Sequence, residues 1–127
     1  MNRKIAISLG LKIDKNNQLD YCIDTRWLKI ANYLGIDFIP ISEFNFPDED
    51  IKFILLTGGN TIGEMLRRDK YERKIIEYVV NSNKKIRLLG ICRGCQLINE
   101  FFGGTNSKVE NHVNKKHKLN NRGIEVT

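Results

Sequence analysis

A cysteine between two glycines has the clearest chemical potential in this sequence. Cys92 is the centre of Gly90-Ile-Cys-Arg-Gly94, which lies between an apolar run at 86–91 and an apolar stretch at 96–102. The spacing G-x-nucleophile-x-G is typical of a sharp strand-to-helix turn that lifts a nucleophile above the edge of a sheet. Such a turn puts the thiol at a helix N-terminus, whose dipole favours its negatively charged form. The segment therefore predicts Cys92 as the nucleophile of a covalent mechanism.

Two backbone N–H groups near this turn are candidates for stabilising an oxyanion. The N–H of Arg93 opens the helix that follows Cys92, so it would point at an oxyanion formed by attack at the thiol. A glycine pair, Gly58–Gly59, follows the apolar run 53–56, and glycine allows a backbone N–H to turn inward. We expect this loop to supply the second donor.

The elements that must position these residues alternate between strand-like and helix-like patterns. We expect strands at 4–9, 38–41, 53–56 and 86–91, and helices at 27–34, 70–80 and 96–102. Asp24 is expected to cap the first helix, and Asp69 with Glu72 is similar to a capping box for the second. The order βαββαβα predicts an α/β fold with an open, mostly parallel sheet and helices on both faces. The active crevice of such a sheet lies beyond the C-terminal strand ends, where both glycine-rich turns fall.

The motifs around the two turns carry a family resemblance. The chain resembles the class I glutamine amidotransferases, in particular their γ-glutamyl hydrolase-like branch, in Leu56-Thr-Gly-Gly-Asn60, Leu89-Gly-Ile-Cys-Arg-Gly-Cys-Gln-Leu-Ile-Asn99 and Phe102-Gly-Gly104. The resemblance implies a flavodoxin-like three-layer sandwich and a glutamyl thioester on Cys92, with no cofactor. It implies that Gly59 and Arg93 hold the oxyanion, and that Gly58, Asn60 and Gln96 help to bind the substrate. Cys95 departs from the family, which usually has a large apolar residue there.

A narrower resemblance concerns four segments of the chain. The chain is similar to members associated with capsule or surface-polysaccharide clusters in Asp24-Thr-Arg-Trp27, Gly58-Gly-Asn60, the stretch from Arg68 to Glu72 and the region from His112 to His117. One activity in that group is hydrolysis of γ-glutamyl-CDP-amidate, which implies a small γ-glutamyl substrate linked to a nucleotide. The loops near 11–20 would then help to select the leaving group. The alternative is a glutaminase that feeds ammonia to a separate synthase.

The resemblance also implies a histidine and a glutamate that activate the thiol and protonate the leaving group. In the family, histidines at the positions of His112 and His117 precede the catalytic one, so neither is assigned as the base. Gly123-Ile-Glu-Val-Thr127 resembles the strand before the catalytic-histidine loop. We therefore expect residues 1–127 to be the N-terminal portion of a single domain that lacks its C-terminal part. Such a chain alone would show little turnover, and its exposed sheet edge would favour association.

The bulk composition fits a small intracellular domain. The 127 residues are 41% hydrophobic and 28% charged, which is enough for one compact core. No run approaches the roughly 18 apolar residues of a membrane span, and the N-terminus lacks a signal-peptide pattern, so we expect a cytoplasmic protein without a membrane partner. The net charge of +6 is spread out and not interleaved with aromatic residues, so no nucleic acid is expected.

Other interpretations of the cysteines stay open. Cys92 and Cys95 form a C-x-x-C pair at a predicted helix N-terminus, as in thiol–disulfide redox proteins. Together with His112 and His117 they have the order of a zinc site, but the spacer is longer than in a zinc finger, and no metal is expected. An inactive binding relative that keeps the turn is the third alternative. The redox interpretation leaves the Gly58–Gly59 loop without a role.

Overall fold

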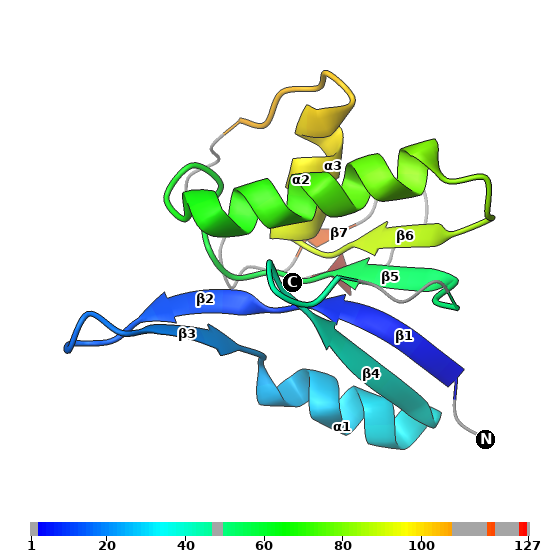
Figure 1. Ribbon diagram of the computed structural model, residues 1–127, viewed down its shortest axis with the longest axis horizontal. Coiled ribbons are helices and arrows are strands. Elements are labelled where there is room, and N and C mark those ends of the chain that lie inside the picture. Colours follow the sequence, from blue (N-terminus) through cyan, green and yellow to red (C-terminus); the bar gives the residue numbers. More distant parts are fainter. Residues whose placement is uncertain (1–2, 47–49, 108–116, 119–124, 127) are drawn as a thin grey trace.

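The computed structural model describes residues 3–46, 50–107, 117–118 and 125–126 of the chain. Four parallel strands form the central sheet in the order β4-β1-β5-β6, with β1 at Arg3–Ser8, β4 at Ile36–Ile41, β5 at Phe53–Leu56 and β6 at Arg87–Gly90. One face carries α1 (Thr25–Leu34), and the other carries α2 (Leu66–Asn81) and α3 (Arg93–Phe101), as Figure 1 shows. This is the flavodoxin-like three-layer sandwich, so the predicted fold class is confirmed.

Strand β1 is the branching point of the sheet. It pairs in parallel with β4 along its whole length on one side, and with β5 through Ala6 and Ile7 on the other. The chain therefore moves away from β1 in opposite directions, and the crevice of a doubly wound sheet opens at such a point. The loops that follow β1 and β5 border that crevice. Strand β6 is the last strand of this sheet in the described residues, and association through its edge stays a prediction.

The hydrophobic core lies between the sheet and the layer formed by α2 and α3. Ile54 and Leu56 of β5, Ile76 of α2 and Leu97 of α3 are completely buried in one cluster. The other layer is less buried, because α1 has no fully buried residue, and its Trp27 packs edge-on against Phe38 of β4. The packing that fixes the strand ends therefore comes from the α2–α3 side.

The ends of α1 agree with the expectation from the sequence. Asp24 accepts a hydrogen bond from the Arg26 N–H at 2.9 Å, which is the predicted N-cap. Gly35 follows the helix with φ 66°, a conformation that glycine adopts without strain. No helix in the described ranges has the length and apolar character needed to cross a membrane.

The starts of α2 and α3 differ from the expectation. α2 begins at Leu66 rather than at 70, and the predicted capping box of Asp69 and Glu72 is wrong. The N-cap is Met65, which makes no side-chain capping bond. Asp69 and Glu72 lie within α2, and their carboxylates are buried in the protein interior. The physical reason is that both carboxylates bind arginine side chains in the interior. α3 begins at Arg93 rather than at 96, directly after Cys92.

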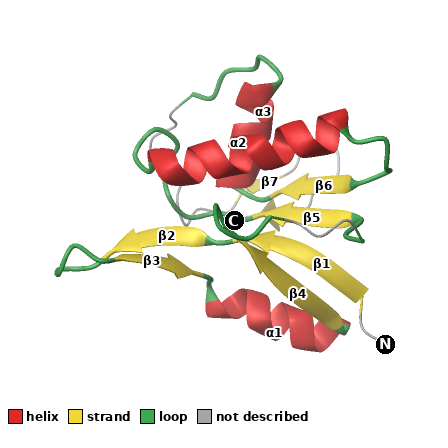
Figure 2. Cartoon of the chain, viewed as in Figure 1, coloured by secondary structure: helices red, strands yellow, loops and turns green. Residues whose placement is uncertain are grey.

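A β-hairpin follows β1 in a segment that was expected to form loops. Strands β2 (Gly10–Ile13) and β3 (Leu19–Cys22) pair antiparallel and project from the sandwich, as Figure 2 shows. The Asp14 carboxylate stabilises the turn by accepting from the N–H groups of Asn16 and Gln18, each at 2.9 Å. Strands β7 (His117–Lys118) and β8 (Glu125–Val126) form another antiparallel pair. His112 and most of the expected polar loop lie outside the described residues.

We expect Ile76→Ala to destabilise the fold strongly. Ile76 is 0% exposed in the core, and removing a buried isoleucine side chain costs about 2–5 kcal/mol of unfolding free energy. Val80→Ala on the same helix is the matched control, because Val80 is 50% exposed and its loss should cost less than about 1 kcal/mol. Urea unfolding measures both values. Equal losses in the two variants would contradict the placement of the core.

Candidate active site

Cys92, the predicted nucleophile, lies in a tight turn between β6 and α3. Its backbone has φ 52° and ψ −108°, a conformation that a residue with a side chain adopts only under strain. Three hydrogen bonds fix the turn: the N–H of Ile91 donates to Leu56 O at 2.9 Å, that of Gly94 to Ile91 O at 3.0 Å, and that of Gln96 to Cys92 O at 3.1 Å. The Cys92 residue is exposed. This is the geometry of a nucleophile elbow.

Gly90 and Gly94 allow this turn because neither position has room for a side chain. A Cβ on Gly94 would lie 2.3 Å from the carbonyl oxygen of Leu56, and a Cβ on Gly90 would lie 2.4 Å from the carbonyl carbon of Gly94. Both neighbours are backbone atoms of packed elements, which cannot move aside locally. The G-x-C-x-G spacing is therefore required by the close approach of α3 to β5 and β6.

The Gly58–Gly59 loop after β5 lies against the Cys92 turn. A Cβ on Gly58 would be 3.4 Å from Cys92 Cβ, which is contact distance. Gly59 has φ 114°, and a Cβ there would lie 2.9 Å from Arg68 Nη1, so conformation and space both require glycine. In the described part of the chain, no hydrogen bond occupies the N–H of Gly59 or that of Arg93, which opens α3. Both predicted donor segments thus border Cys92.

Arg68, near the start of α2, holds the Gly58–Gly59 loop from inside the protein. Its side chain is 0% exposed and donates to Thr57 O at 3.0 Å, Thr57 Oγ1 at 3.0 Å, Gly58 O at 2.8 Å and Asn60 Oδ1 at 3.1 Å. The loop is also tied to the end of β1, since the Thr57 N–H donates to Ser8 Oγ at 2.9 Å. The loop conformation therefore depends on one guanidinium with donors on several sides.

The Glu72 carboxylate connects Arg68 to Arg93, and the Asp69 carboxylate adds a second partner for Arg93. Glu72 Oε1 accepts from Arg68 Nε at 3.2 Å, and Glu72 Oε2 accepts from Arg93 Nη1. Asp69 Oδ1 accepts from Arg93 Nη2, and Asp69 Oδ2 accepts from the Gly63 N–H at 2.8 Å. The four charged side chains are at most 3% exposed, and their formal charges sum to zero. Arg68, Asp69, Glu72 and Arg93 form what we call the buried ion network.

Asn60 joins the hairpin to the Gly58–Gly59 loop. Its Oδ1 accepts from the Leu11 N–H at 3.0 Å as well as from Arg68, and its Nδ2 donates to Leu11 O at 2.8 Å. The side chain therefore positions strand β2 beside the loop. Its predicted contact with substrate stays a prediction.

A cavity of about 690 Å³ opens in front of Cys92 at the C-terminal ends of the strands. Its lining includes Gly59 and Cys92, together with Lys12 of the hairpin and Arg26 and Trp27 of α1. Asp24 also lines it, and its hydrogen bonds with Arg26 lower the Asp24 pKa to about 2. Asp24 therefore stays ionised at neutral pH and balances Arg26, so that Lys12 gives this part of the lining a net positive charge.

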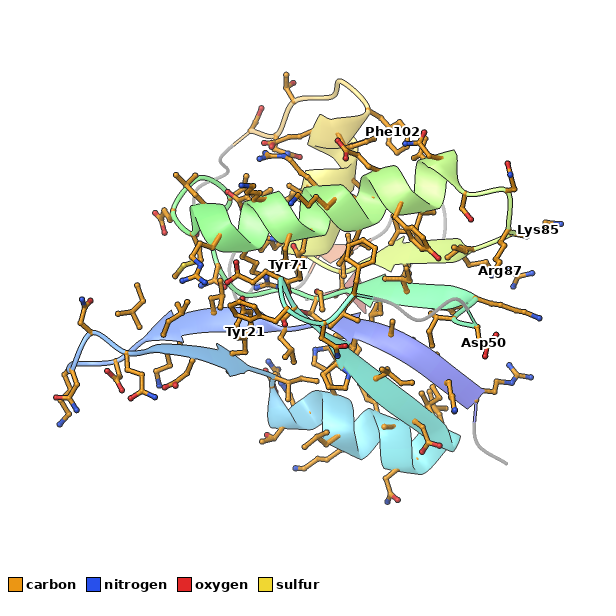
Figure 3. The ribbon with its side chains drawn as sticks, viewed as in Figure 1. Tyr21, Asp50, Tyr71, Lys85, Arg87 and Phe102 are labelled. Carbon is orange, nitrogen blue, oxygen red and sulfur yellow. The ribbon has the colours of Figure 1, made fainter. Side chains whose placement is uncertain are left out.

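Tyr21 and Tyr71 fix the base of the hairpin against α2. Figure 3 shows the two rings close together, and their centroids lie 6.4 Å apart. The Tyr71 hydroxyl donates to Leu9 O at the end of β1, and burial raises the Tyr71 pKa above its ordinary value. Burial and the hydrogen bond to Glu43 raise the pKa of Tyr21 to about 12. Both phenols therefore stay neutral donors at physiological pH, and the hydrogen bonds that they donate to Glu43 and to Leu9 O keep their donors there.

Another hollow, of about 660 Å³, lies at the opposite ends of β5 and β6. Asp50, Lys85 and Arg87 line it, and Figure 3 shows them far from the hairpin. It contains none of the predicted site residues. The cavity at Cys92 is therefore the candidate active site, because it lies where a doubly wound sheet binds its ligand.

Gln96 and Cys95 do not line the cavity at Cys92. Gln96 lies in α3 one turn after Cys92, is exposed, and is not among the residues that line the cavity. Its contact with a glutamyl group stays a prediction. Cys92 and Cys95 are both free thiols. Among the described residues no group of three potential metal ligands occurs, and His112 lies outside them.

The buried ion network was missed by the sequence analysis. Its signal is the R-D-x-x-E pattern from Arg68 to Glu72, in which the charged residues fall on the same helix face as Tyr71, Ile75 and Ile76. Charged residues in line with an apolar stripe indicate paired, buried ions rather than a solvated surface.

The sandwich and the elbow together define a protein of the glutamine amidotransferase-like class. The Peptidase C26 family profile matches residues 51–126, a range that contains the Gly58–Gly59 loop, the buried ion network and the Cys92 turn. The chain belongs to the Peptidase C26 family. This membership confirms the family that the sequence motifs indicated.

Curated relatives cover much of the same chain. A γ-glutamyl-CDP-amidate hydrolase of Campylobacter jejuni is 33% identical over 80% of this chain and 56% of its own length. A protein of Schizosaccharomyces pombe named as a candidate glutamine amidotransferase is 30% identical over 80% of this chain and 43% of its own length. A glutamine-hydrolysing GMP synthase of Ehrlichia canis is 31% identical over 78% of this chain and 17% of its own length. The chain spans about half the length of the first two.

We expect Gly94→Ala to destabilise the protein, because its new Cβ would overlap Leu56 O at 2.3 Å. Overpacking of this kind costs about 1–3 kcal/mol or more, which lowers the melting temperature by roughly 5 °C or more. Gly10→Ala is the matched control, since its Cβ would approach no atom closer than 3.4 Å. Differential scanning calorimetry compares them. A Gly94→Ala variant as stable as Gly10→Ala would contradict the close packing of the elbow.

Proposed function

We propose that this chain carries the nucleophile and oxyanion site of an enzyme that hydrolyses γ-glutamyl amide bonds. The observation that supports the proposal most strongly is the strained Cys92 turn, which faces the cavity beside the Gly58–Gly59 loop. A strained elbow with two nearby N–H donors suits nucleophilic attack on a carbonyl, because the negative charge that develops on oxygen is stabilised at once. Membership in the Peptidase C26 family supports the same reaction class.

In the proposed reaction, the Cys92 thiolate attacks the γ-carbonyl carbon and forms a C–S bond. The oxyanion accepts hydrogen bonds from the N–H groups of Gly59 and Arg93. The C–N bond then breaks, the leaving nitrogen takes a proton, and a glutamyl thioester remains on Cys92. Water attacks the thioester through a second oxyanion, which releases glutamate and regenerates the thiol. We assign the proton donor to neither His112 nor His117.

The proposed substrate is γ-glutamyl-CDP-amidate, within capsular polysaccharide modification. The name of the Campylobacter relative supports it, and so do residues of the hairpin and α1 that line the cavity with Cys92. Lys12 and Arg26 could approach phosphate oxygens, while Trp27 offers an aromatic surface to a base. The protein's net charge of +6 would favour the approach of such an anion.

A glutaminase that supplies ammonia to a separate synthase is the second candidate function. The similarity to a glutamine-hydrolysing GMP synthase favours it. The chemistry at Cys92 would be the same, but the leaving group would be ammonia rather than a nucleotide amidate. Substrate preference therefore separates the two functions.

The test is glutamate release by the product of the complete open reading frame that encodes this chain. Glutamine, γ-glutamyl-GABA and γ-glutamyl-CDP-amidate form the substrate panel. We expect fast release from the nucleotide conjugate, and a loss of at least about 1,000-fold in kcat for Cys92→Ser, because the nucleophile is removed. Cys95→Ser is the matched control and should stay within about threefold of the wild type.

Each result supports or contradicts one part of the proposal. Preference for glutamine would contradict the hydrolysis of a nucleotide conjugate and support the ammonia-supplying function. Equal losses in Cys92→Ser and Cys95→Ser would favour a C-x-x-C redox pair. Full turnover in Cys92→Ser would overturn the proposed nucleophile.

A further inference from the structure

The two proposed oxyanion donors lie on separate segments of the chain. Gly59 follows β5, whereas Arg93 opens α3 after β6. Each donor segment is held by a different arginine, and both arginines bind Glu72. A continuous set of contacts therefore runs from the Gly58–Gly59 loop through α2 to the Cys92 turn.

We propose that Arg68, Asp69, Glu72 and Arg93 are positioning residues that fix the separation of the Gly59 and Arg93 N–H groups around the Cys92 thiol. This inference rests on the function proposed above. Asp69, Glu72 and Arg93 do not line the cavity, so they act through the backbone they hold. Arg68 borders the cavity, but its side chain is 0% exposed and its donors bind the carbonyls of Thr57 and Gly58, so it also acts through the loop. The role is distinct from binding the substrate.

Glu72 is the central member of the network. One of its carboxylate oxygens accepts from Arg68 and the other from Arg93, so a single side chain sets the distance between the two guanidinium groups. Each guanidinium is in turn attached to one donor segment. Arg68 binds the carbonyls of Thr57 and Gly58, and Arg93 belongs to the donor peptide itself.

A lysine at position 68 could not make the contacts that Arg68 makes. Its side chain makes five contacts, of which four reach the Gly58–Gly59 loop and one reaches Glu72. Lysine keeps the charge, but its three donors radiate from one atom and cannot reach these acceptors in one plane. Gly59 has no side chain to hold it when the arginine is lost. Its N–H should then lose its fixed direction.

The test distinguishes an effect on the oxyanion site from an effect on the reactivity of the thiol. It uses the product of the complete open reading frame. Hydrolysis of γ-glutamyl-CDP-amidate requires the oxyanion donors, whereas alkylation of Cys92 by iodoacetamide does not, because it forms no oxyanion. Trypsin cleaves after Arg93, so mass spectrometry distinguishes Cys92 from Cys95. Arg67→Lys is the matched control, since Arg67 is the adjacent residue and lies exposed in a surface ion pair with Glu43.

For Arg68→Lys we expect kcat to fall by about 100-fold, the loss typical of one oxyanion donor, with KM changed by less than about threefold. The rate of Cys92 alkylation should stay within about twofold of the wild type, and Arg67→Lys should leave all three values unchanged. Glu72→Gln, which keeps the side-chain shape, should show the same selective loss of kcat. It tests the network even where Arg68→Lys does not fold.

Two results would overturn the inference while the proposed function stands. One is a wild-type kcat in both Arg68→Lys and Glu72→Gln. The other is an equal loss of hydrolysis and alkylation, which would place the effect on the thiol or on the whole fold. A wild-type protein without Cys92-dependent hydrolysis would instead overturn the proposed function, and this inference with it.

Discussion

The obligatory pairing of four buried ions is the constraint on which the candidate site depends. Removing a charged side chain from water costs several kcal/mol unless a partner replaces the solvent. Arg68 pairs with Glu72, and Arg93 pairs with both Glu72 and Asp69, so both arginines meet this condition only where α2 presents its two carboxylates to them. The position of α2 therefore sets the places of the Gly58–Gly59 loop and of the elbow. A register shift in the helix would leave at least one ion unpaired in the interior.

The strain at Cys92 is tolerated because the surrounding packing leaves the backbone no alternative. Gly90 and Gly94 approach neighbouring backbone atoms so closely that α3 must begin directly after the turn. Residues in such conformations persist only where the structure over-determines them. The strained backbone and the exposed thiol are consequences of the same close packing, so the sequence that folds the turn also exposes the Cys92 side chain.

Several elements could be predicted from the sequence because a local pattern determines them. The continuous apolar run 53–56 predicted the buried strand β5, and Asp24 and Gly35 predicted the two ends of α1. The hairpin at 10–22 was missed because it projects from the sandwich, and so lacks a long alternating pattern. The roles of Asp69 and Glu72 depend on Arg93, which lies more than twenty residues further along the chain, so a local capping rule misassigned them. Long-range pairing of charges cannot be read from one segment.

The most direct test of the central claim is to trap the covalent intermediate. The product of the complete open reading frame is mixed with γ-glutamyl-CDP-amidate and quenched in acid, and its peptides are fragmented in a mass spectrometer to separate Cys92 from Cys95. A glutamyl group on Cys92 that disappears as glutamate is released is the result that the account predicts. Continued glutamate release without any adduct on Cys92, or an adduct on Cys95 instead, would contradict it.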